Sequence, residues 1–353
     1  MEDVFTRLAH HLDSLPIPFP PSDSGVELKI LRQWFTSQEA EIATVLTLMP
    51  EPVAAIAERL ELDTDKLASI LNDMSKKGII FRIVTKNGRK LYAVAQFVPG
   101  MFEFHVNDLD LELIKDADEY LETWMGKGWF ANKTTPSRVV PISESIPVGM
   151  NVMPYESARE VIQQQARIGV TECICRKMNK IRGNACEHPL EVCLMFGVGA
   201  DYYVENAIGR YVTHEEALEI LKTGEEAGLV LQPYNAQNPT NICMCCSCAC
   251  SVMKTLYKMD KPAEVIHSNF YVRIDEDDCT SCGLCLERCQ MNAITLDDIA
   301  RVNRNRCIGC GACVVACEFG AIRLCQKDES ERYVPPATVI DTNVCMMKER
   351  GKL

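Results

Sequence analysis

Eight cysteines near the C-terminal end constrain the fold of this chain more than any other feature. They form two copies of the pattern C-x2-C-x2-C-x3-C, and each cysteine of the second copy follows its counterpart by 28 positions, as Cys307 follows Cys279. A framework residue recurs at the same offset, since Gly283 returns as Gly311. Repetition of ligands together with framework residues indicates an internal duplication.

The spacing of these thiols predicts iron–sulfur clusters. Thiolates are soft ligands, and four of them at this spacing suit a [4Fe–4S] cluster. The first three cysteines of each copy lie on a tight loop that glycine permits, and the fourth reaches across to the other cluster. The predicted ligands of one cluster are Cys279, Cys282, Cys285 and Cys317, and those of the other are Cys289, Cys307, Cys310 and Cys313. A disulfide scaffold and zinc sites are the alternatives, but zinc knuckles need neither the crossed ligand nor the duplicated framework.

With this pattern, residues 270–325 resemble the bacterial two-cluster [4Fe–4S] ferredoxins. The resemblance implies a ferredoxin-like fold that carries single electrons at low potential. One departure is visible, because the proline that usually follows the fourth cysteine is Gln290 in the first copy and Glu318 in the second. This change leaves the ligands intact and affects the local turn.

Nine more cysteines lie between residues 166 and 269. They are Cys173, Cys175, Cys186, Cys193, Cys243, Cys245, Cys246, Cys248 and Cys250. The run over residues 243–250 cannot direct all of its thiols into one core, so the sequence predicts at least one further iron–sulfur cluster among the nine. A helix over residues 247–253 would place Cys246 and Cys250 on one face, with Cys243 and Cys245 on the preceding loop. Zinc sites and buried thiols without metal are the alternatives.

The order of cysteines along residues 140–325 resembles multi-cluster 4Fe–4S binding proteins of anaerobic bacteria and archaea. It runs from Cys173-Ile-Cys175-Arg176 through the dense run to the duplicated motif. The resemblance implies a redox function and names no substrate. Cys325 and Cys345 receive no role.

The predicted fold class is α+β. Residues 25–100 show a capping box at Thr36, further helical patterns and a hairpin signal at Asn87-Gly88, and this order resembles a winged helix. The predicted division is an N-terminal arm (1–24), a winged-helix-like domain (25–100), a helical connector (101–165), a mixed α/β cysteine-rich domain (166–269), a 2[4Fe–4S] ferredoxin-like domain (270–325) and a tail (326–353).

The charge of the chain argues against nucleic-acid binding. Arg82, Lys86, Arg89 and Lys90 would form a basic wing, but the presumed recognition helix begins with acidic residues at Asp63 and the net charge is −12. We therefore expect the N-terminal domain to dock a protein or to form a homodimer. The acidic balance is compatible with a basic patch on a redox partner protein.

The start of the chain has no secretory signal pattern, and its longest apolar stretch is too short to span a bilayer, so we expect a cytoplasmic protein. Three functions follow from the cysteines. The first is electron transfer between the two C-terminal clusters, a middle centre and a partner oxidoreductase. The second is an oxidoreductase with an open iron or reactive thiolate in residues 243–250, and the third is a redox-sensing regulator. No dinucleotide or P-loop motif is present, and no catalytic residue is assigned.

Overall fold

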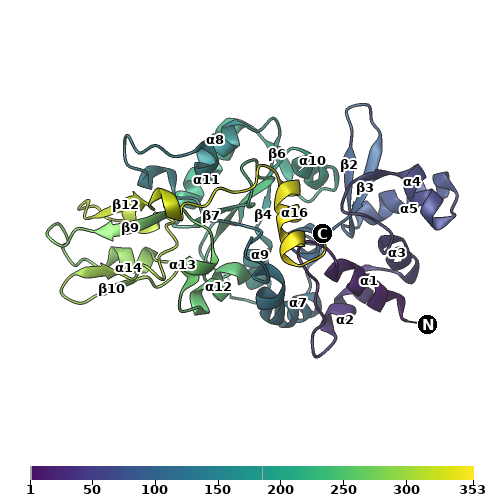
Figure 1. Cartoon of the computed structure of the whole chain (residues 1–353), viewed down its shortest axis with the longest axis horizontal. Helices are drawn as coiled ribbons and strands as arrows, with labels where there is room; N and C mark the ends of the chain where they lie inside the picture. Colours follow the sequence, from purple (N-terminus) through teal and green to yellow (C-terminus); the bar gives the residue numbers. More distant parts are fainter. Residues whose placement is uncertain (1, 185) are drawn as a thin grey trace.

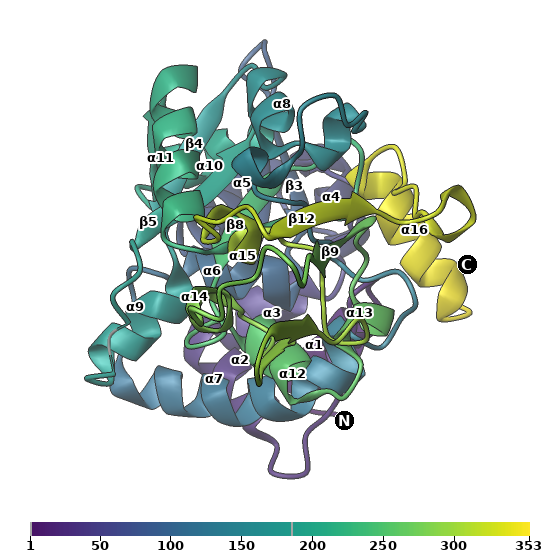
Figure 2. The same cartoon turned by 90° about the vertical axis from the view of Figure 1, so that its left-hand side faces the viewer.

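The computed structural model of the chain describes residues 2–184 and 186–353. The N-terminal elements and the cysteine-rich C-terminal elements lie at opposite ends, with a larger sheet between them (Figure 1). Seen from the end that carries the cysteine-rich C-terminal elements, strands β9 and β12 lie in front of the rest of the molecule (Figure 2). No helix in these two stretches has the length and apolar content needed to cross a membrane.

The N-terminal part contains helices and a small antiparallel sheet. Its elements are α1 (Val4–Asp13), α2 (Val26–Trp34), α3 (Ser37–Ala43), β1 (Glu51–Pro52), α4 (Val53–Leu60), α5 (Thr64–Lys76), β2 (Ile80–Val84) and β3 (Lys90–Val94). The strands pair in the order β1-β3-β2. Thr36 and Glu39 form the capping box that begins α3, and the Asp63 side chain accepts from the Lys66 amide at the start of α5. Side-chain caps therefore explain where α3 and α5 begin.

Residues on both sides of this region share its core. Helix α7 (Leu111–Trp124) packs against α2, and its Trp124 Nε1 donates to the carbonyl of Pro18 at 2.8 Å. The Tyr120 hydroxyl donates to the carbonyl of Pro20 at 3.0 Å. The Phe97 ring lies between these two helical aromatics. The proline-rich segment is thus fixed along α7.

A five-stranded antiparallel sheet occupies the middle of the molecule in the order β6-β4-β5-β8-β7. Its strands are β4 (Ile168–Glu172), β5 (Glu191–Phe196), β6 (Arg210–Val212), β7 (Val230–Pro233) and β8 (Asn241–Cys245). The helices of this part are α8 (Ala158–Gln163), α9 (Ile174–Ile181), α10 (Val198–Glu205), α11 (His214–Glu226), α12 (Ser251–Lys258) and α13 (Pro262–Val265). Helices α8 and α11 share a core with one face of the sheet, and α10 packs on the other face at Gly169.

The C-terminal module repeats a short strand–loop–helix unit. Its elements are β9 (Phe270–Ile274), α14 (Leu284–Arg288), β10 (Ile294–Leu296), β11 (Ala300–Val302), α15 (Ala312–Val315) and β12 (Ile322–Gln326). Strand β9 pairs with β12, and β10 pairs with β11. Helix α16 (Val339–Glu349) then returns toward the N-terminal part, where Arg350 donates to the carbonyl of Asp13 at 2.7 Å.

The remaining helical elements are short. They are η1 (Phe97–Met101), α6 (Phe102–Phe104), η2 (Met125–Trp129), η3 (Ser143–Ser145), η4 (Pro154–Glu156) and η5 (Glu329–Glu331). Two of them connect parts of the molecule, because η2 packs against α12 and η3 packs against α15.

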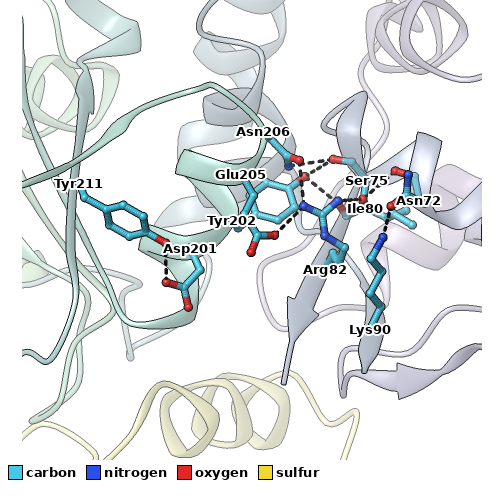
Figure 3. Close-up of polar contacts among 10 residues, drawn as sticks. All are labelled: Asn72, Ser75, Ile80, Arg82, Lys90, Asp201, Tyr202, Glu205, Asn206 and Tyr211. Atoms are coloured by element: carbon cyan, nitrogen blue, oxygen red, sulfur yellow. Dashed lines mark hydrogen bonds and ion pairs between the residues drawn. The ribbon is translucent and has the colours of Figure 1, made fainter. Parts of the chain in front are cut away.

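Strand β2 is held against α10 by a buried arginine (Figure 3). Arg82 is only 5% exposed, and it donates to Ser75 Oγ at 2.6 Å, to Glu205 Oε2 at 2.9 Å and to Asn206 Oδ1 at 3.2 Å. The Tyr202 hydroxyl lies 2.8 Å from the carbonyl of Ser75. Arg82, one of the residues expected in a basic wing, therefore joins two parts of the same chain.

Replacing Arg82 by alanine should destabilise this contact. The change removes a buried guanidinium together with its charge-assisted hydrogen bonds. We therefore expect the free energy of unfolding to fall by about 2 kcal/mol. Arg89→Ala is the matched control, because Arg89 lies exposed at the tip of the same hairpin. Anaerobic urea denaturation measures both, and equal stabilities of the two variants would contradict this role of Arg82.

Candidate metal centres

The eight C-terminal cysteines line two cavities that are open to solvent. Three thiols of one loop and the fourth of the other repeat meet in each cavity. The first cavity is lined by Cys279, Cys282, Cys285 and Cys317, and the second by Cys289, Cys307, Cys310 and Cys313. The structure thus brings together the same two sets of residues that the spacing predicts as ligands.

Backbone geometry explains how these loops expose their thiols. Gly283 and Gly311 have φ values of +82° and +79°, directly before α14 and α15. A Cβ at Gly311 would lie 2.1 Å from Ser145 Oγ, so a side chain there would displace the η3 turn. The backbone amide of Ala293 donates to Cys289 Sγ at 3.2 Å. The backbone amide of Ala300 donates to Cys279 Sγ at 3.5 Å and lowers the pKa of that thiol, because the hydrogen bond favours the thiolate.

The two cavities differ in their exposure to solvent. Cys282 is exposed in the first cavity, and Phe319 beside it is 53% exposed. In the second cavity burial raises the pKa of Cys310 to about 12, and burial also raises the pKa values of Cys307 and Cys313. Desolvation penalises the charged thiolate, so these thiols require a cation to ionise. Burial also raises the pKa of Cys285 in the first cavity, but Cys282 gives that cavity the one exposed thiol among the eight. We therefore call the first cavity the outer one and the second the inner one.

Six of the nine middle cysteines form a closed series of neighbours, here called the six-thiol ring. Each thiol lies beside the next, in the order Cys173, Cys175, Cys250, Cys245, Cys243, Cys193 and back to Cys173. The first two lie at the start of α9, Cys193 lies on β5, and the others lie on β8 and at the start of α12. Every thiol of the ring is buried or half-buried.

Acidic side chains that the sequence did not single out lie near this ring. The Glu103 carboxylate accepts from the Gly100 amide at 2.7 Å, and burial raises the pKa of Glu103 to about 8, with a further contribution from Cys243 and Cys173. Burial likewise raises the pKa of Tyr203, which also lies near Cys243. Neutral groups at these positions leave thiolates as the anionic donors of the ring. An all-sulfur donor set of this kind suits an iron–sulfur cluster or zinc.

The three other middle cysteines form a second group, here called the three-thiol group. The Sγ atoms of Cys186, Cys246 and Cys248 all lie within 4.8 Å of one another, and those of Cys246 and Cys248 are 3.1 Å apart. Cys246 is buried and Cys248 is exposed. Nothing in the spacing of Cys186 connects it with the other two, because 60 residues of chain separate Cys186 from Cys246.

The expectation that Cys246 and Cys250 share a helical face is wrong. Helix α12 begins only at Ser251, and Cys243 and Cys245 lie on β8 instead of a loop. Pairing of β8 with β5 and β7 extends this segment. Alternate residues of a strand point to the same side, so Cys243 and Cys245 reach one group of thiols and Cys246 reaches the other.

Arg176 lies next to both groups of thiols. It is 2% exposed, and its Nη1 and Nη2 atoms each donate to the carbonyl of Met244 at 3.1 Å. Nη1 also lies 3.7 Å from Cys246 Sγ. Burial lowers the pKa of Arg176, but nearby thiolates, Cys173 first, raise it to a greater extent. The sequence showed Arg176 only as part of the Cys-x-Cys-Arg motif.

Gln290 connects the C-terminal module with the dense cysteine run. Its Oε1 accepts hydrogen bonds at 2.8 Å from both the amide and the hydroxyl of Ser247, the residue between Cys246 and Cys248. Its Nε2 donates to the carbonyl of Gly228 at 3.3 Å. Gln290, one of the two residues that replace the usual proline, therefore makes a contact between the two cysteine-rich parts.

Comparisons with known proteins agree with the duplicated motif. Residues 272–295 and 300–323 each match the family model of the 4Fe-4S binding domain, again 28 residues apart. No curated protein and no solved structure shows significant similarity to the chain. The C-terminal module is thus a ferredoxin-like pair of 4Fe–4S binding repeats. These repeats support iron–sulfur electron transfer as the general function of the module.

Proposed function

We propose that this protein passes single low-potential electrons between a partner oxidoreductase and a metal centre in its own middle part. The two C-terminal clusters form the route, and when bound they supply one-electron redox chemistry. The outer cluster is the one in the first cavity, and its proposed ligands are Cys279, Cys282, Cys285 and Cys317. The inner cluster is the one in the second cavity, and its proposed ligands are Cys289, Cys307, Cys310 and Cys313. The six-thiol ring holds a further iron–sulfur centre.

The contact of Gln290 with Ser247 carries this proposal. Gln290 directly follows Cys289, which we propose as a ligand of the inner cluster, and Ser247 lies between two cysteines of the three-thiol group. A short hydrogen-bonded path therefore joins the inner cavity to the cysteine-rich middle.

The outer cavity supports docking of the redox partner. Phe319 and Leu284 expose apolar surface beside Cys282, at 53% and 37%. Asp275 to Asp278 are all exposed on the segment leading into this loop. An apolar contact rimmed by acidic residues fits a basic face on the partner, because opposite charges steer association.

The N-terminal region supports a role in protein docking. We propose that residues 25–100 form a winged-helix-like domain that either binds a protein or pairs with a second copy. Arg82 on β2 already donates to Glu205 on α10. Lys90 Nζ donates to Asn72 Oδ1 at 2.6 Å. Two of the four cations of the hairpin are thereby engaged within the chain, which weakens the case for a regulator that binds DNA.

An enzymatic function is the second candidate. It is favoured by the exposure of Cys248 in a group that offers three thiols. In that case the C-terminal clusters would supply electrons to a reaction at the three-thiol group.

Replacing Gln290 by proline, the residue usual for the family, tests the proposed route. We expect the iron content to stay unchanged and the reduction of the middle centre to become slower, because three hydrogen bonds across the contact are lost. The contact should also weaken by about 1–2 kcal/mol. Glu318→Pro is the matched control, since Glu318 holds the equivalent place in the other repeat and is exposed.

The measurement is rapid anaerobic mixing with a strong reductant, followed by freezing and EPR spectroscopy. The result expected is a delay in the middle-centre signal for Gln290→Pro alone. Identical time courses for wild type and both variants would count against electron transfer through this contact.

A further inference from the structure

We infer that the three-thiol group, formed by Cys186, Cys246 and Cys248, binds a single Zn²⁺ ion and leaves the fourth position of that ion to water. The site is separate from the six-thiol ring, for which we propose an iron–sulfur centre. Zn²⁺ has no redox chemistry, so this site takes no part in the proposed route of electrons and does not depend on it.

The separation of the three thiols fits one ion. Their Sγ atoms all lie within 4.8 Å of one another, and those of Cys246 and Cys248 are 3.1 Å apart. Zinc binds thiolates at about 2.3 Å, so two thiolates of a tetrahedral zinc site lie roughly 3.8 Å apart. A small rotation of the exposed Cys248 side chain would open the pair to that spacing.

The other cysteines of the chain are spaced differently. The thiolates that hold a cubane cluster bind different irons, so they lie farther apart than the ligands of one ion. Within residues 2–184 and 186–353, no other three cysteines come within 4.8 Å of one another, and this includes the ligands predicted for the two C-terminal clusters. The three-thiol group therefore differs in its geometry from the sites that suit iron–sulfur clusters.

Neighbouring side chains hold the backbone around two of the thiols. Ser247, the residue between Cys246 and Cys248, donates its amide and its hydroxyl to Gln290 Oε1 at 2.8 Å. The carbonyl of Cys248 accepts from Asn179 Nδ2 at 3.1 Å. Contacts of this kind orient metal ligands. The turn that carries the two thiols is thus fixed on both sides.

A buried cation offsets the charge of the occupied site. Metal ligands are thiolates, so three of them with one Zn²⁺ leave one negative charge uncompensated. The guanidinium of Arg176 is 2% exposed, and its Nη1 atom lies 3.7 Å from Cys246 Sγ. Opposite charges attract more strongly away from water, so Arg176 stabilises the anionic site.

The donors of the group select zinc among the common metal ions. The group offers three sulfur atoms, whereas Mg²⁺ and Ca²⁺ prefer oxygen ligands. Fe²⁺ also accepts thiolates, but Zn²⁺ binds a given site more tightly than Fe²⁺ does. A single Zn²⁺ is therefore the occupant that this set of donors favours.

The fourth position of the ion faces solvent. A further protein ligand of the same ion would also lie within 4.8 Å of the three thiols, because the ligands of one zinc are roughly 3.8 Å apart. Among the residues that the structure describes, no fourth cysteine, histidine or carboxylate does so. Cys248 is exposed, which gives water access to the ion. Three protein ligands and one water are typical of catalytic zinc, whereas structural zinc usually has four protein ligands.

The test uses the full chain, purified anaerobically from cells supplied with both iron and zinc. We compare wild type with the double variant Cys186→Ser/Cys248→Ser, which changes only thiols that are not buried, and with Cys325→Ser. Cys325 is the matched control, because it lies on β12 and lines neither of the two C-terminal cavities. Elemental analysis counts iron and zinc, and X-ray absorption spectroscopy at the zinc edge identifies the ligand atoms.

We expect about one zinc per chain in wild type and in Cys325→Ser, and none in the double variant. The iron content and the EPR signals of the C-terminal clusters should be the same in all three proteins, which also shows that the double variant is folded. The zinc of wild type should have three sulfur atoms at about 2.3 Å and one oxygen atom at about 2 Å.

Four results would overturn the inference. They are a wild type without zinc, a double variant that keeps its zinc, a folded double variant that loses iron together with zinc, and a zinc ion with four sulfur ligands. The first and the last are measured on wild type, so they decide the matter even if the double variant does not fold.

Discussion

Replacing Cys289 by serine will remove the cluster of the second loop and leave the cluster of its own loop in place. Cys289 belongs to the first repeat, but its thiol lines the cavity formed by Cys307, Cys310 and Cys313. We expect a loss of about four irons per chain, because serine does not replace a soft thiolate ligand of a cubane cluster. Electron transfer to the middle part should stop as well, since the inner cluster connects the outer one with it.

Cys317→Ser is the reciprocal variant. Its thiol lines the first cavity, so this change should remove the outer cluster and spare the inner one. EPR spectra of the reduced proteins, compared with each other and with Cys325→Ser, distinguish the two losses. If each serine instead removed the cluster of its own loop, the crossed assignment would be incorrect.

Replacing Cys250 by serine should have the second large effect. Cys250 lies at the start of α12, and its thiol lies beside those of Cys175 and Cys245 in the six-thiol ring. A metal in the ring would join β5, β8, α9 and α12, so the loss of one ligand should release iron and destabilise the packing of these elements. We expect about four irons to be lost and the anaerobic melting temperature to fall, because metal binding contributes directly to folding.

The control for this variant is Cys345→Ser, on α16 outside both groups of middle thiols. The EPR signals of the two C-terminal clusters report whether the rest of the chain is folded. Retention of the full iron content and melting temperature in Cys250→Ser would show that the ring binds no metal.

Local sequence features account for much of the fold. The capping box at Thr36, the Asn87-Gly88 turn and the two loop glycines each depend on residues within a few positions, and each forms as expected. The duplicated cysteines predict the two cavities for a similar reason, because the pattern is local and is repeated. Only the crossing of the fourth thiol requires a contact between the repeats.

The division of the nine middle thiols depends on contacts over long distances in the chain. Arg176 reaches the carbonyl of Met244 across 68 residues, and Ser247 meets Gln290 across 43. Periodicity carries no information on such pairings. The burial of Arg82 escaped prediction in the same way, because its partner Glu205 is 123 residues distant.

The residue after the fourth cysteine of each repeat is the one signal that could have revealed the contact of Gln290 with Ser247. Gln290 is a polar residue where the family usually has a rigid one, and a side chain with a donor and an acceptor can bind a neighbouring segment. Glu318 makes the same departure and lies exposed. The sequence alone does not distinguish the two positions.

Iron and acid-labile sulfide counts on the anaerobically purified chain, together with Mössbauer spectroscopy, test the central claim most directly. The two C-terminal clusters account for about eight irons. We predict a clear excess over that number, with additional iron signals that the Cys250→Ser variant lacks. A content of about eight irons, all in four-thiolate cubanes, would contradict a metal centre in the middle part and with it the proposed route of electrons.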